Sequence, residues 1–485
     1  STSVASIASA VGPSLASMAP LGPLGSNVHA DATAARATRI QGRGGRTMPG
    51  GYAGCARGGN TARGWREEWR RSRDGGNVAP MSELIFRGGT IVTVDDGRRV
   101  VAGDVAVRDG VIVAVGGAYT PAGHDYQIID ASGCVVMPGL VQAHVHTCQT
   151  LARGKADDRE LLDWLHQVVW PYEGALDAAA RAAAAELAMA ELLLGGTTAI
   201  LDMATVHHTE AVFAAAERSG IRATIGKAMM DAPDPAIPPG LREATAASLA
   251  ESDALADRWH GAADGRLRYA YAPRFVLSCT DELLAEVGRR AAARGVGIHT
   301  HASENQGEIA AVAARFGKRN LAALADLGVL GPRTGIAHCI HLDEHEIELL
   351  AATGTHVLHC PSSNLKLASG IAAIPELIDR GVAVAIGADG APCNNNLDGF
   401  LELRLTALLH KPRVGPKAMP AAQALAVATR GGAAALGLGD QLGALEVGRR
   451  GDVIAVDVTG PHLAPVTDPL SALVYAARAS DVRHV

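Results

Sequence analysis

Two histidines separated by one residue, His144 and His146, are the first residues of this chain whose types and spacing could do chemistry. In an extended strand alternate side chains point to the same side, so both imidazoles can reach one point. The apolar run from Cys134 to Met137, followed by Pro138 and a glycine, is typical of a buried strand entered through a turn. A chain with 18 histidines can meet the spacing by chance, so the partners of the pair decide whether it binds a metal.

The candidate partners stand at the ends of later apolar runs: His301, His338 and Asp389, with Glu304 three residues after His301. Imidazoles with a carboxylate suit Zn²⁺, and they leave a position for a water whose pKa the metal lowers to about 7. Glu304 is then placed to take a proton from that water and pass it to the leaving side of the substrate. Each residue alone has an ordinary explanation, such as a turn at Asp389, but together they predict a metal site.

The elements that must position these residues are short apolar runs alternating with helix-length amphipathic segments. The expected strands lie at residues 135–146, 197–201, 223–226, 267–271, 297–301, 334–338, 356–359 and 383–387. Eight strand–helix repeats predict an α/β fold, a (β/α)8 barrel, in which catalytic groups gather at the carboxyl ends of the strands. The polar stretch from Cys360 to Lys366, after the seventh expected strand, is a further candidate for the pocket, together with His359.

The segments before and after the expected barrel have a different sequence pattern. Residues 81–136 alternate β-rich runs with Gly and Asp turns, which predicts a small antiparallel sheet. After residue 440, the runs 443–448 and 452–457 show the same β-rich pattern and are expected to complete that sheet. We therefore expect a catalytic barrel at 137–439 and one small β domain built from 81–136 and 440–485.

Residues 1–80 differ from the rest, because Ser, Ala, Gly and Arg dominate and no apolar period is sustained. We expect this segment to be disordered. Its composition resembles that of an organellar transit peptide, but it lacks a convincing amphipathic period. We therefore favour upstream sequence that does not belong to the mature protein.

Composition narrows the function classes. With 48% hydrophobic residues and a net charge of −6, the chain has the character of a globular enzyme, and it has no basic face with interleaved aromatics for nucleic acid or anionic membrane. The longest apolar segment, residues 178–194, contains Arg181, Glu186 and Glu191, which favours an Ala-rich helix over a membrane span. Seven scattered cysteines without CxxC spacing indicate a reducing compartment, the cytoplasm, and no disulfide framework.

From about residue 83 onward the chain resembles the amidohydrolase superfamily, specifically its branch of s-triazine hydrolases and adenosine-derivative deaminases. The matching stretches are PGLVQAHVHTCQTLARG, LLDWLHQVVWPYE, THASENQGE, HCPSSNLKLASG and GADGAPCNNNLD. The resemblance implies a TIM-like metal-dependent hydrolase barrel with a β-sandwich built from both chain ends. It also implies one divalent metal, Zn²⁺ or alternatively Fe²⁺, held by His144, His146, His301 and Asp389. Homodimerisation is an expectation from the family alone.

The resemblance also assigns roles and substrate contacts. Glu304 is cast as the acid/base, with His338 and Asp389 orienting the water and polarising the bound substrate. Glu173 matches a glutamate that holds ribose hydroxyls in methylthioadenosine and S-adenosylhomocysteine deaminases, and a carboxylate is suited to accept from a diol. Gln149 and Arg274 instead match residues that read the purine edge in guanine deaminases.

The loop 389–398 favours the adenosine-deaminase and triazine-hydrolase pattern over that of guanine deaminases. We therefore predict zinc-dependent deamination of a 6-aminopurine nucleoside: 5′-deoxyadenosine, methylthioadenosine or S-adenosylhomocysteine. The segment Pro273-Arg274-Phe275 departs from the histidine-containing segment of the adenosylhomocysteine enzymes. The alternatives are a guanine deaminase, an s-triazine chlorohydrolase or aminohydrolase, and a non-catalytic barrel subunit, which would require missing ligands. Family members usually continue beyond the position of Val485, so we expect a shortened C-terminal part of the sandwich.

Overall fold

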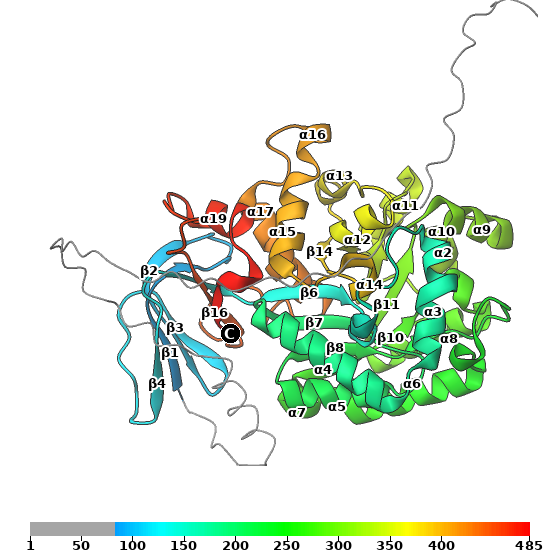
Figure 1. The fold of residues 1–485 in the computed structure, drawn as a ribbon, viewed down its shortest axis with the longest axis horizontal. Helices are drawn as coiled ribbons and strands as arrows, with labels where there is room; N and C mark the ends of the chain where they lie inside the picture. Colours follow the sequence, from blue (N-terminus) through cyan, green and yellow to red (C-terminus); the bar gives the residue numbers. More distant parts are fainter. Residues whose placement is uncertain (1–82) are drawn as a thin grey trace, which may run out of the picture. The chain divides into compact units, whose positions relative to one another are not determined.

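The alternating strand and helix segments close into a barrel in the computed structural model, which describes residues 83–485. Its eight parallel strands are β6 (Leu140–Val145), β7 (Thr197–Met203), β8 (Arg222–Gly226), β10 (Leu267–Pro273), β11 (Gly297–Ala302), β12 (Thr334–His338), β13 (His356–His359) and β14 (Val384–Ile386). Pairing of β14 with β6 and of β10 with β11 closes the ring (Figure 1). The predicted (β/α)8 fold is confirmed. The tail expected at residues 1–80 lies outside the described residues.

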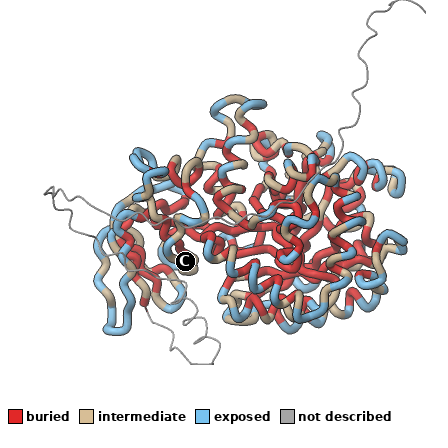
Figure 2. Tube along the Cα trace, viewed as in Figure 1, coloured by how far each residue is buried: buried red, intermediate tan, exposed pale blue. Residues whose placement is uncertain are grey.

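The barrel strands are buried on both faces, which is why their sequences read as continuous apolar runs. Every residue of β6, β7, β12, β13 and β14 is buried, whereas the surrounding helices expose one face (Figure 2). The longer of these helices are α4 (Ala178–Leu194), α5 (Thr209–Ser219), α6 (Thr245–Trp259), α8 (Asp281–Arg294), α9 (Gln306–Phe316), α10 (Asn320–Asp326), α11 (Glu344–Thr353), α13 (Ile374–Asp379) and α15 (Gly399–Leu408).

Helix α8 illustrates how local sequence sets these elements. The Thr280 hydroxyl accepts from the Leu283 backbone N–H at the start of the helix, and Gly295 ends it in a left-handed conformation. Leu283, Val287 and Ala291 recur at helical spacing and are buried. The helix therefore packs one apolar stripe against the barrel and leaves its charged face in solvent.

A second sheet contains strands from both ends of the described chain. Its members are β1 (Glu83–Val92), β2 (Val100–Arg108), β3 (Val111–Val115), β4 (Tyr126–Asp130), β5 (Cys134–Pro138), β15 (Val453–Asp457) and β16 (Val482–His484). The predicted antiparallel sheet is wrong in one respect, because β4 and β5 both run parallel to β1 and the sheet is mixed. The division into domains stays a prediction.

Two expected strands are wrong. The run 135–146 is two strands in different sheets, β5 and β6, separated at Gly139. A side chain at Gly139 would lie 2.1 Å from the Thr198 hydroxyl, so a glycine is required where the chain passes from one sheet to the other. The run 443–448 forms no strand, because Gly443 and Gly448 have φ values of 82° and 94°, which break an extended conformation.

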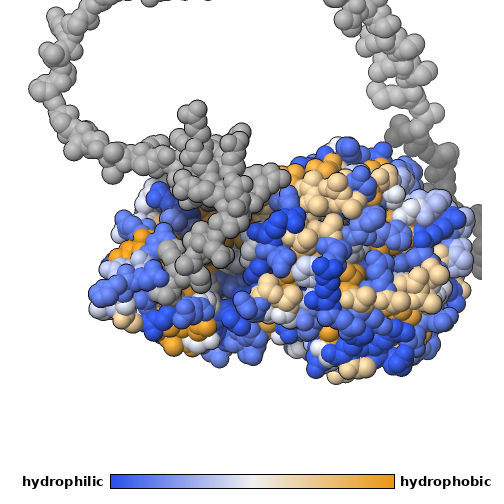
Figure 3. Space-filling view, turned by 90° about the horizontal axis from the view of Figure 1, so that it is seen from below, coloured by the Kyte–Doolittle hydropathy of each residue, from blue (hydrophilic) through white to orange (hydrophobic). Residues whose placement is uncertain are grey.

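Among residues 83–485, no helix combines the length and the apolar character needed to cross a membrane. The helix predicted in place of a span is α4, and its Arg181 is buried, with Nη2 donating to the Glu173 carbonyl at 2.8 Å. On the face seen in Figure 3, hydrophobic residues lie in separate groups among hydrophilic ones. Such scattered groups are ordinary for a protein surface.

Candidate active site and metal centre

The nine predicted site residues lie at or just beyond the carboxyl ends of barrel strands. His144 is in β6, His301 in β11 and His338 at the end of β12, while the others follow strands or lie in η1 (Thr147–Ala152) and α3 (Trp170–Ala175). All are buried except His301, which is partly exposed. The fold thus brings side chains separated by more than two hundred residues to one end of the barrel.

The hydrogen bonds of two of the predicted ligands fix their tautomers. His146 Nδ1 lies 2.8 Å from the Met203 carbonyl, and His301 Nδ1 lies 2.7 Å from the Arg274 carbonyl. A carbonyl only accepts, so each Nδ1 carries the proton and each Nε2 keeps a lone pair. The two Nε2 atoms are 3.2 Å apart, so two lone pairs face each other. A cation between them resolves this repulsion, and backbone carbonyls behind ligating histidines are a usual support for a metal site.

Asp389 and His144 complete the predicted ligand set. Asp389 Oδ1 lies 3.3 Å from His144 Nε2 and 3.4 Å from His146 Nε2. The buried His144 Nε2 has no hydrogen-bonding partner, while its Nδ1 lies 2.7 Å from His299 Nε2. The set therefore contains three imidazoles and one carboxylate, and one of the imidazole nitrogens is buried without a partner. These groups fit a divalent ion of the zinc type.

The backbone at two of the site residues is in a conformation that L-residues rarely adopt. His338 has φ 73° and Asp389 has φ 63°. Left-handed non-glycine residues cost free energy and gather at functional sites, where the surrounding structure holds them. These values are an independent sign that the ends of β12 and β14 are built for a site.

Glu304 and His338 form a second pair beside the predicted ligands. Glu304 Oε2 lies 3.4 Å from His338 Nε2, and Ser369 Oγ donates to Glu304 Oε1 at 3.4 Å. Burial raises the pKa of Glu304 to about 7, where a carboxyl can both accept and donate a proton. Burial opposes the charged form of His338, but the facing carboxylates of Glu304 and Asp389 outweigh it and raise its pKa.

Three of the four predicted substrate contacts, all but His338, are joined through the carboxylate of Glu173. Arg274 pairs with Glu173, with Nη1 to Oε2 at 2.5 Å and Nη2 to Oε1 at 3.2 Å. Gln149 Nε2 donates to Glu173 Oε1 at 2.7 Å, which leaves the buried Gln149 Oε1 without a partner. Burial opposes ionisation of Glu173, but Arg274 more than compensates and lowers its pKa. A side chain at Gly390 would lie 2.0 Å from Gln149 Oε1, so glycine makes room for this amide.

Asp202, at the end of β7, was not predicted as a site residue. Its carboxylate accepts from the Thr147 backbone N–H at 3.0 Å and from the Thr147 hydroxyl at 2.6 Å. It thereby holds the turn that follows His146 and carries Gln149. A lone carboxylate ending the apolar strand TTAILDM was a readable signal. Ser363 and Asn364, which also contact site residues, lie in the polar stretch that the sequence did single out.

His359, at the end of β13, faces His410 after α15 with ring centroids 5.8 Å apart, and none of their four ring nitrogens has a partner. Burial lowers the pKa of His359 to about 3 and that of His410 to about 4, from 6.5. The unfolded chain therefore binds more protons between pH 6.5 and 4, so the free energy of unfolding falls as pH falls through this range. Each group contributes at most about 1.4 kcal/mol per pH unit.

Replacing His410 by phenylalanine removes one of these titrations. We expect wild type to lose more of its free energy of unfolding than His410→Phe between pH 7 and 5, as measured by urea unfolding in the same buffers. The difference between the two proteins cancels the contribution of the remaining groups. Equal losses in both proteins would contradict a neutral buried pair.

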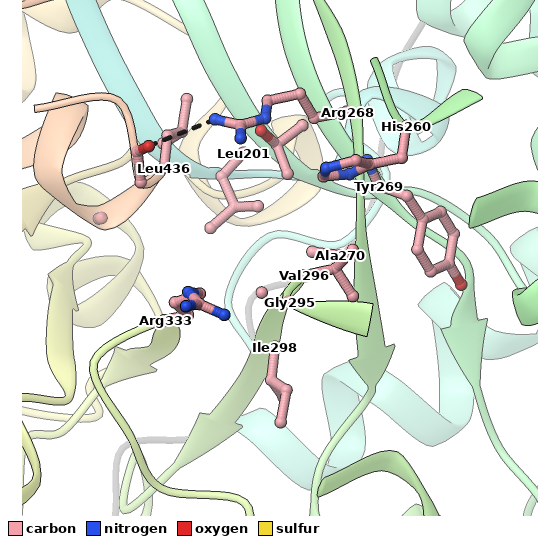
Figure 4. A pocket seen from close by; sticks show the side chains of 14 residues that line it. Leu201, His260, Arg268, Tyr269, Ala270, Gly295, Val296, Ile298, Arg333 and Leu436 are labelled. Atoms are coloured by element: carbon pink, nitrogen blue, oxygen red, sulfur yellow. Dashed lines mark hydrogen bonds between the residues drawn. The ribbon is translucent and has the colours of Figure 1, made fainter. Parts of the chain in front are cut away.

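A cavity of about 90 Å³ opens at the amino-terminal ends of β10 and β11, at the other end of the barrel (Figure 4). Arg268, Arg333 and His260 lie around it, and Arg268 donates to the Gly437 carbonyl at 3.3 Å. None of the predicted site residues lines this cavity. In barrel enzymes the chemistry is at the carboxyl-terminal end, so this cavity is separate from the site.

Comparison with known proteins bears on the site. Residues 135–485 match the Amidohydrolase family. The chain is 44% identical over 411 residues to a 5-methylthioadenosine/S-adenosylhomocysteine deaminase of Syntrophobacter fumaroxidans, covering 83% of this chain and 91% of that protein. It is 39% identical over 405 residues to a 5′-deoxyadenosine deaminase of Methanosarcina acetivorans, with 83% and 91% covered.

Solved structures of deaminases and of a chlorohydrolase are also similar to this chain. An adenosine deaminase of Xanthomonas campestris with bound zinc is 36% identical, with a TM-score of 0.77 over 82% of this chain and 90% of that one. A guanine deaminase of C. acetobutylicum with bound guanine is 25% identical, with a TM-score of 0.75 over 82% and 97%. Atrazine chlorohydrolase of Arthrobacter aurescens complexed with zinc is 26% identical, with a TM-score of 0.76 over 83% and 95%.

Proposed function

The chain belongs to the amidohydrolase family, and from this membership we propose that it is a metal-dependent aminohydrolase acting on a 6-aminopurine nucleoside. The substrates are 5′-deoxyadenosine, methylthioadenosine or S-adenosylhomocysteine, and the products are the inosine analogue and ammonia. The observation that carries the proposal is the convergence of fixed lone pairs on His146 and His301 beside the Glu304–His338 pair. Curated relatives at 39–44% identity that bear these deaminase names support the substrate class.

The proposed ion is Zn²⁺, with Fe²⁺ as the alternative, held by His144, His146, His301 and Asp389. When bound, the ion supplies Lewis-acid activation of the attacking water. Asp389 Oδ1 is the oxygen directed at the imidazoles, since Oδ2 accepts from Ser363. Neutral imidazoles are required as ligands, and burial already lowers the pKa of His146 to about 4.

Glu304 moves the protons of the reaction. Its carboxylate takes a proton from the attacking water as the water oxygen bonds to C6, and it returns this proton to the adjacent ring nitrogen. When the C6–N bond breaks, Glu304 passes the remaining proton of the C6 hydroxyl to the departing amine, which leaves as ammonia while the C6 oxygen becomes the 6-oxo group. A pKa near 7 suits both transfers at neutral pH. When its Nε2 is also protonated, His338, 3.4 Å from Glu304, donates to and stabilises the charge that develops on the attacking oxygen.

A specific observation favours guanine deamination as the second candidate. Glu173 Oε1 already accepts from Gln149 and Arg274, and Oε2 accepts from Arg274, so little of this carboxylate is free for a ribose diol. The unpartnered Gln149 Oε1 instead needs a donor from the ligand, such as an N–H on the edge of a base. For Glu173 to accept from the hydroxyls of a nucleoside, Arg274 must give up one of its two hydrogen bonds to this carboxylate.

Replacing Glu173 by glutamine separates these alternatives and nearly preserves side-chain volume. If Glu173 accepts from ribose hydroxyls, KM for nucleosides should rise about tenfold or more, because a hydrogen bond to a charged group is worth about 1.5–3 kcal/mol. KM for free bases should change little. Steady-state kinetics on adenosine and guanine measure both effects, and equal increases would count against a ribose role.

The experiment that tests the proposed function is an ammonia-release screen of the zinc-loaded protein. The panel contains 5′-deoxyadenosine, methylthioadenosine, S-adenosylhomocysteine, adenosine, guanine and a chloro-s-triazine. Activity confined to the adenosine derivatives supports the proposal and ranks the 5′ groups. Ammonia from guanine alone supports the second candidate, chloride without ammonia supports a triazine hydrolase, and no turnover supports a non-catalytic barrel.

We extend the proposal to the compartment. The six cysteines in the described part of the chain are all buried and free, which suits a reducing compartment such as the cytoplasm. Homodimerisation stays a prediction from the family. Size-exclusion chromatography with light scattering measures the oligomeric state directly.

A further inference from the structure

The segment 361–370, which follows β13 and begins with α12 (Pro361–Lys366), contacts site residues at or just after the ends of three other strands. Three of its side chains each bond a different site residue: Ser363 bonds Asp389, Asn364 bonds His338 and Ser369 bonds Glu304. These three partners are the residues to which the reaction assigns proton transfer and orientation. One short segment therefore supports all of them.

We propose that segment 361–370 is the positioning element of the site, and that Asn364 within it sets the tautomer of His338. The inference rests on the proposed function, because it concerns the residues that handle protons in that reaction. Asn364 is a positioning residue, since it acts through His338. Its side chain is buried, with 1% of its surface exposed.

The position of Asn364 determines which nitrogen of His338 carries the proton. Its Oδ1 lies 2.8 Å from His338 Nδ1, and an amide oxygen only accepts, so Nδ1 carries a proton. His338 Nε2 points the other way, 3.4 Å from Glu304 Oε2 and 3.9 Å from Asp389 Oδ2. The nitrogen that faces the reacting groups is therefore Nε2. The bond made by the far nitrogen of a histidine commonly determines which nitrogen is free to react.

Ser363 orients the Asp389 carboxylate in a similar way. Its hydroxyl donates to Asp389 Oδ2 at 2.7 Å, and Oδ1 is then the oxygen within 3.4 Å of the imidazoles of His144 and His146. A carboxylate free to rotate would present either oxygen. Ser363 thus occupies Oδ2, while Oδ1, which also accepts from the Gly390 backbone N–H at 2.8 Å, is the oxygen beside the predicted ligands.

The segment is itself held firmly, as a positioning element requires. Glu402 on α15 accepts from the Ser362 backbone N–H at 3.1 Å and from the Ser362 hydroxyl at 2.5 Å. The Asn364 carbonyl accepts from the backbone N–H groups of Ser369 and Gly370 at 2.9 and 3.3 Å. Lys366 Nζ donates to the Pro392 carbonyl at 3.0 Å, which ties the segment to the short helix α14 (Ala391–Asn394) after β14.

The test compares Asn364→Leu, which removes the acceptor at similar volume, with Asn364→Asp, which keeps an acceptor oxygen. Protein labelled with ¹⁵N-histidine reports the protonated ring nitrogen of His338, assigned by its loss in His338→Gln. Wild type and Asn364→Asp should carry the proton on Nδ1, and Asn364→Leu should lose this preference. Its kcat should fall about 10–100-fold with little change in KM, as for supports of ligating residues, and Asn364→Asp should recover most of it.

Two results would overturn the inference. One is a wild-type His338 protonated on Nε2 alone, and the other is an Asn364→Leu protein with unchanged tautomer and kcat. The spectra are read without any substrate, in metal-free and zinc-loaded protein. If wild type releases no ammonia, the proposed function fails while the tautomer is still measured. If wild type is active and the variants do not differ, the inference alone fails.

Discussion

Replacing Glu304 by glutamine is expected to lower kcat about a thousandfold while the protein still binds zinc. A positioned acid/base contributes about 10²- to 10⁴-fold to rate, and the amide cannot accept the proton of the attacking water. Glutamine has nearly the same volume and can still accept from the Ser369 hydroxyl, which lies 3.4 Å from Oε1. The measurement is steady-state turnover of 5′-deoxyadenosine, with bound zinc counted by elemental analysis.

Glu308 offers a matched control, because it is equally buried and lies four residues away. Its carboxylate accepts from the backbone N–H groups of Glu304 and Asn305, so it supports the turn and faces no predicted ligand. Glu308→Gln should lower thermal stability more than turnover. If Glu304→Gln keeps more than a tenth of the wild-type kcat, the assigned proton transfer is wrong.

Loss of one predicted ligand should be as damaging. His301→Ala is expected to remove both bound zinc and measurable turnover, because the remaining His146 Nε2 loses the partner that faces it at 3.2 Å. Wild-type protein should also melt at a higher temperature with zinc than after chelation. Zinc at one hundred times its Kd stabilises the folded state by about 2.7 kcal/mol.

His345→Ala is the control for this variant, since His345 is exposed on α11. It should retain zinc and turnover. Differential scanning calorimetry with and without chelator measures the stability effect. Full zinc occupancy in His301→Ala, or an identical melting temperature of wild type in both conditions, would contradict the predicted metal centre.

The barrel could be predicted because buried parallel strands leave a plain record in sequence. The run from Thr197 to Leu201 has no charged residue and is buried on both faces, and similar runs recur at helix-length intervals. The errors arose where an apolar run continues across two sheets, as at Gly139, or where glycines interrupt it, as at Gly443. Apolar periodicity does not report which sheet a strand joins, since that depends on partners far along the chain.

The convergence of the candidate site residues was predictable where residue type and strand position coincide, as for His146, His301 and Asp389. The pairing of Glu173 with Arg274 was not, because the two residues are 101 positions apart and each was read as facing the substrate. Asn364 was likewise read only as part of a polar stretch. A side chain that acts through another residue stands at no characteristic sequence spacing from the catalytic residues. Its role is therefore seen only in the folded structure.

Hydrolytic removal of the 6-amino group at a metal centre is a claim that isotope labelling tests directly. The zinc-loaded protein is incubated with 5′-deoxyadenosine in ¹⁸O-water, and the products are analysed by mass spectrometry and an ammonia assay. We predict one ¹⁸O atom in the 6-oxo group and one equivalent of ammonia per product, lost after chelation and restored by zinc. No labelled product from any purine nucleoside, or turnover that is indifferent to chelation, would contradict the claim.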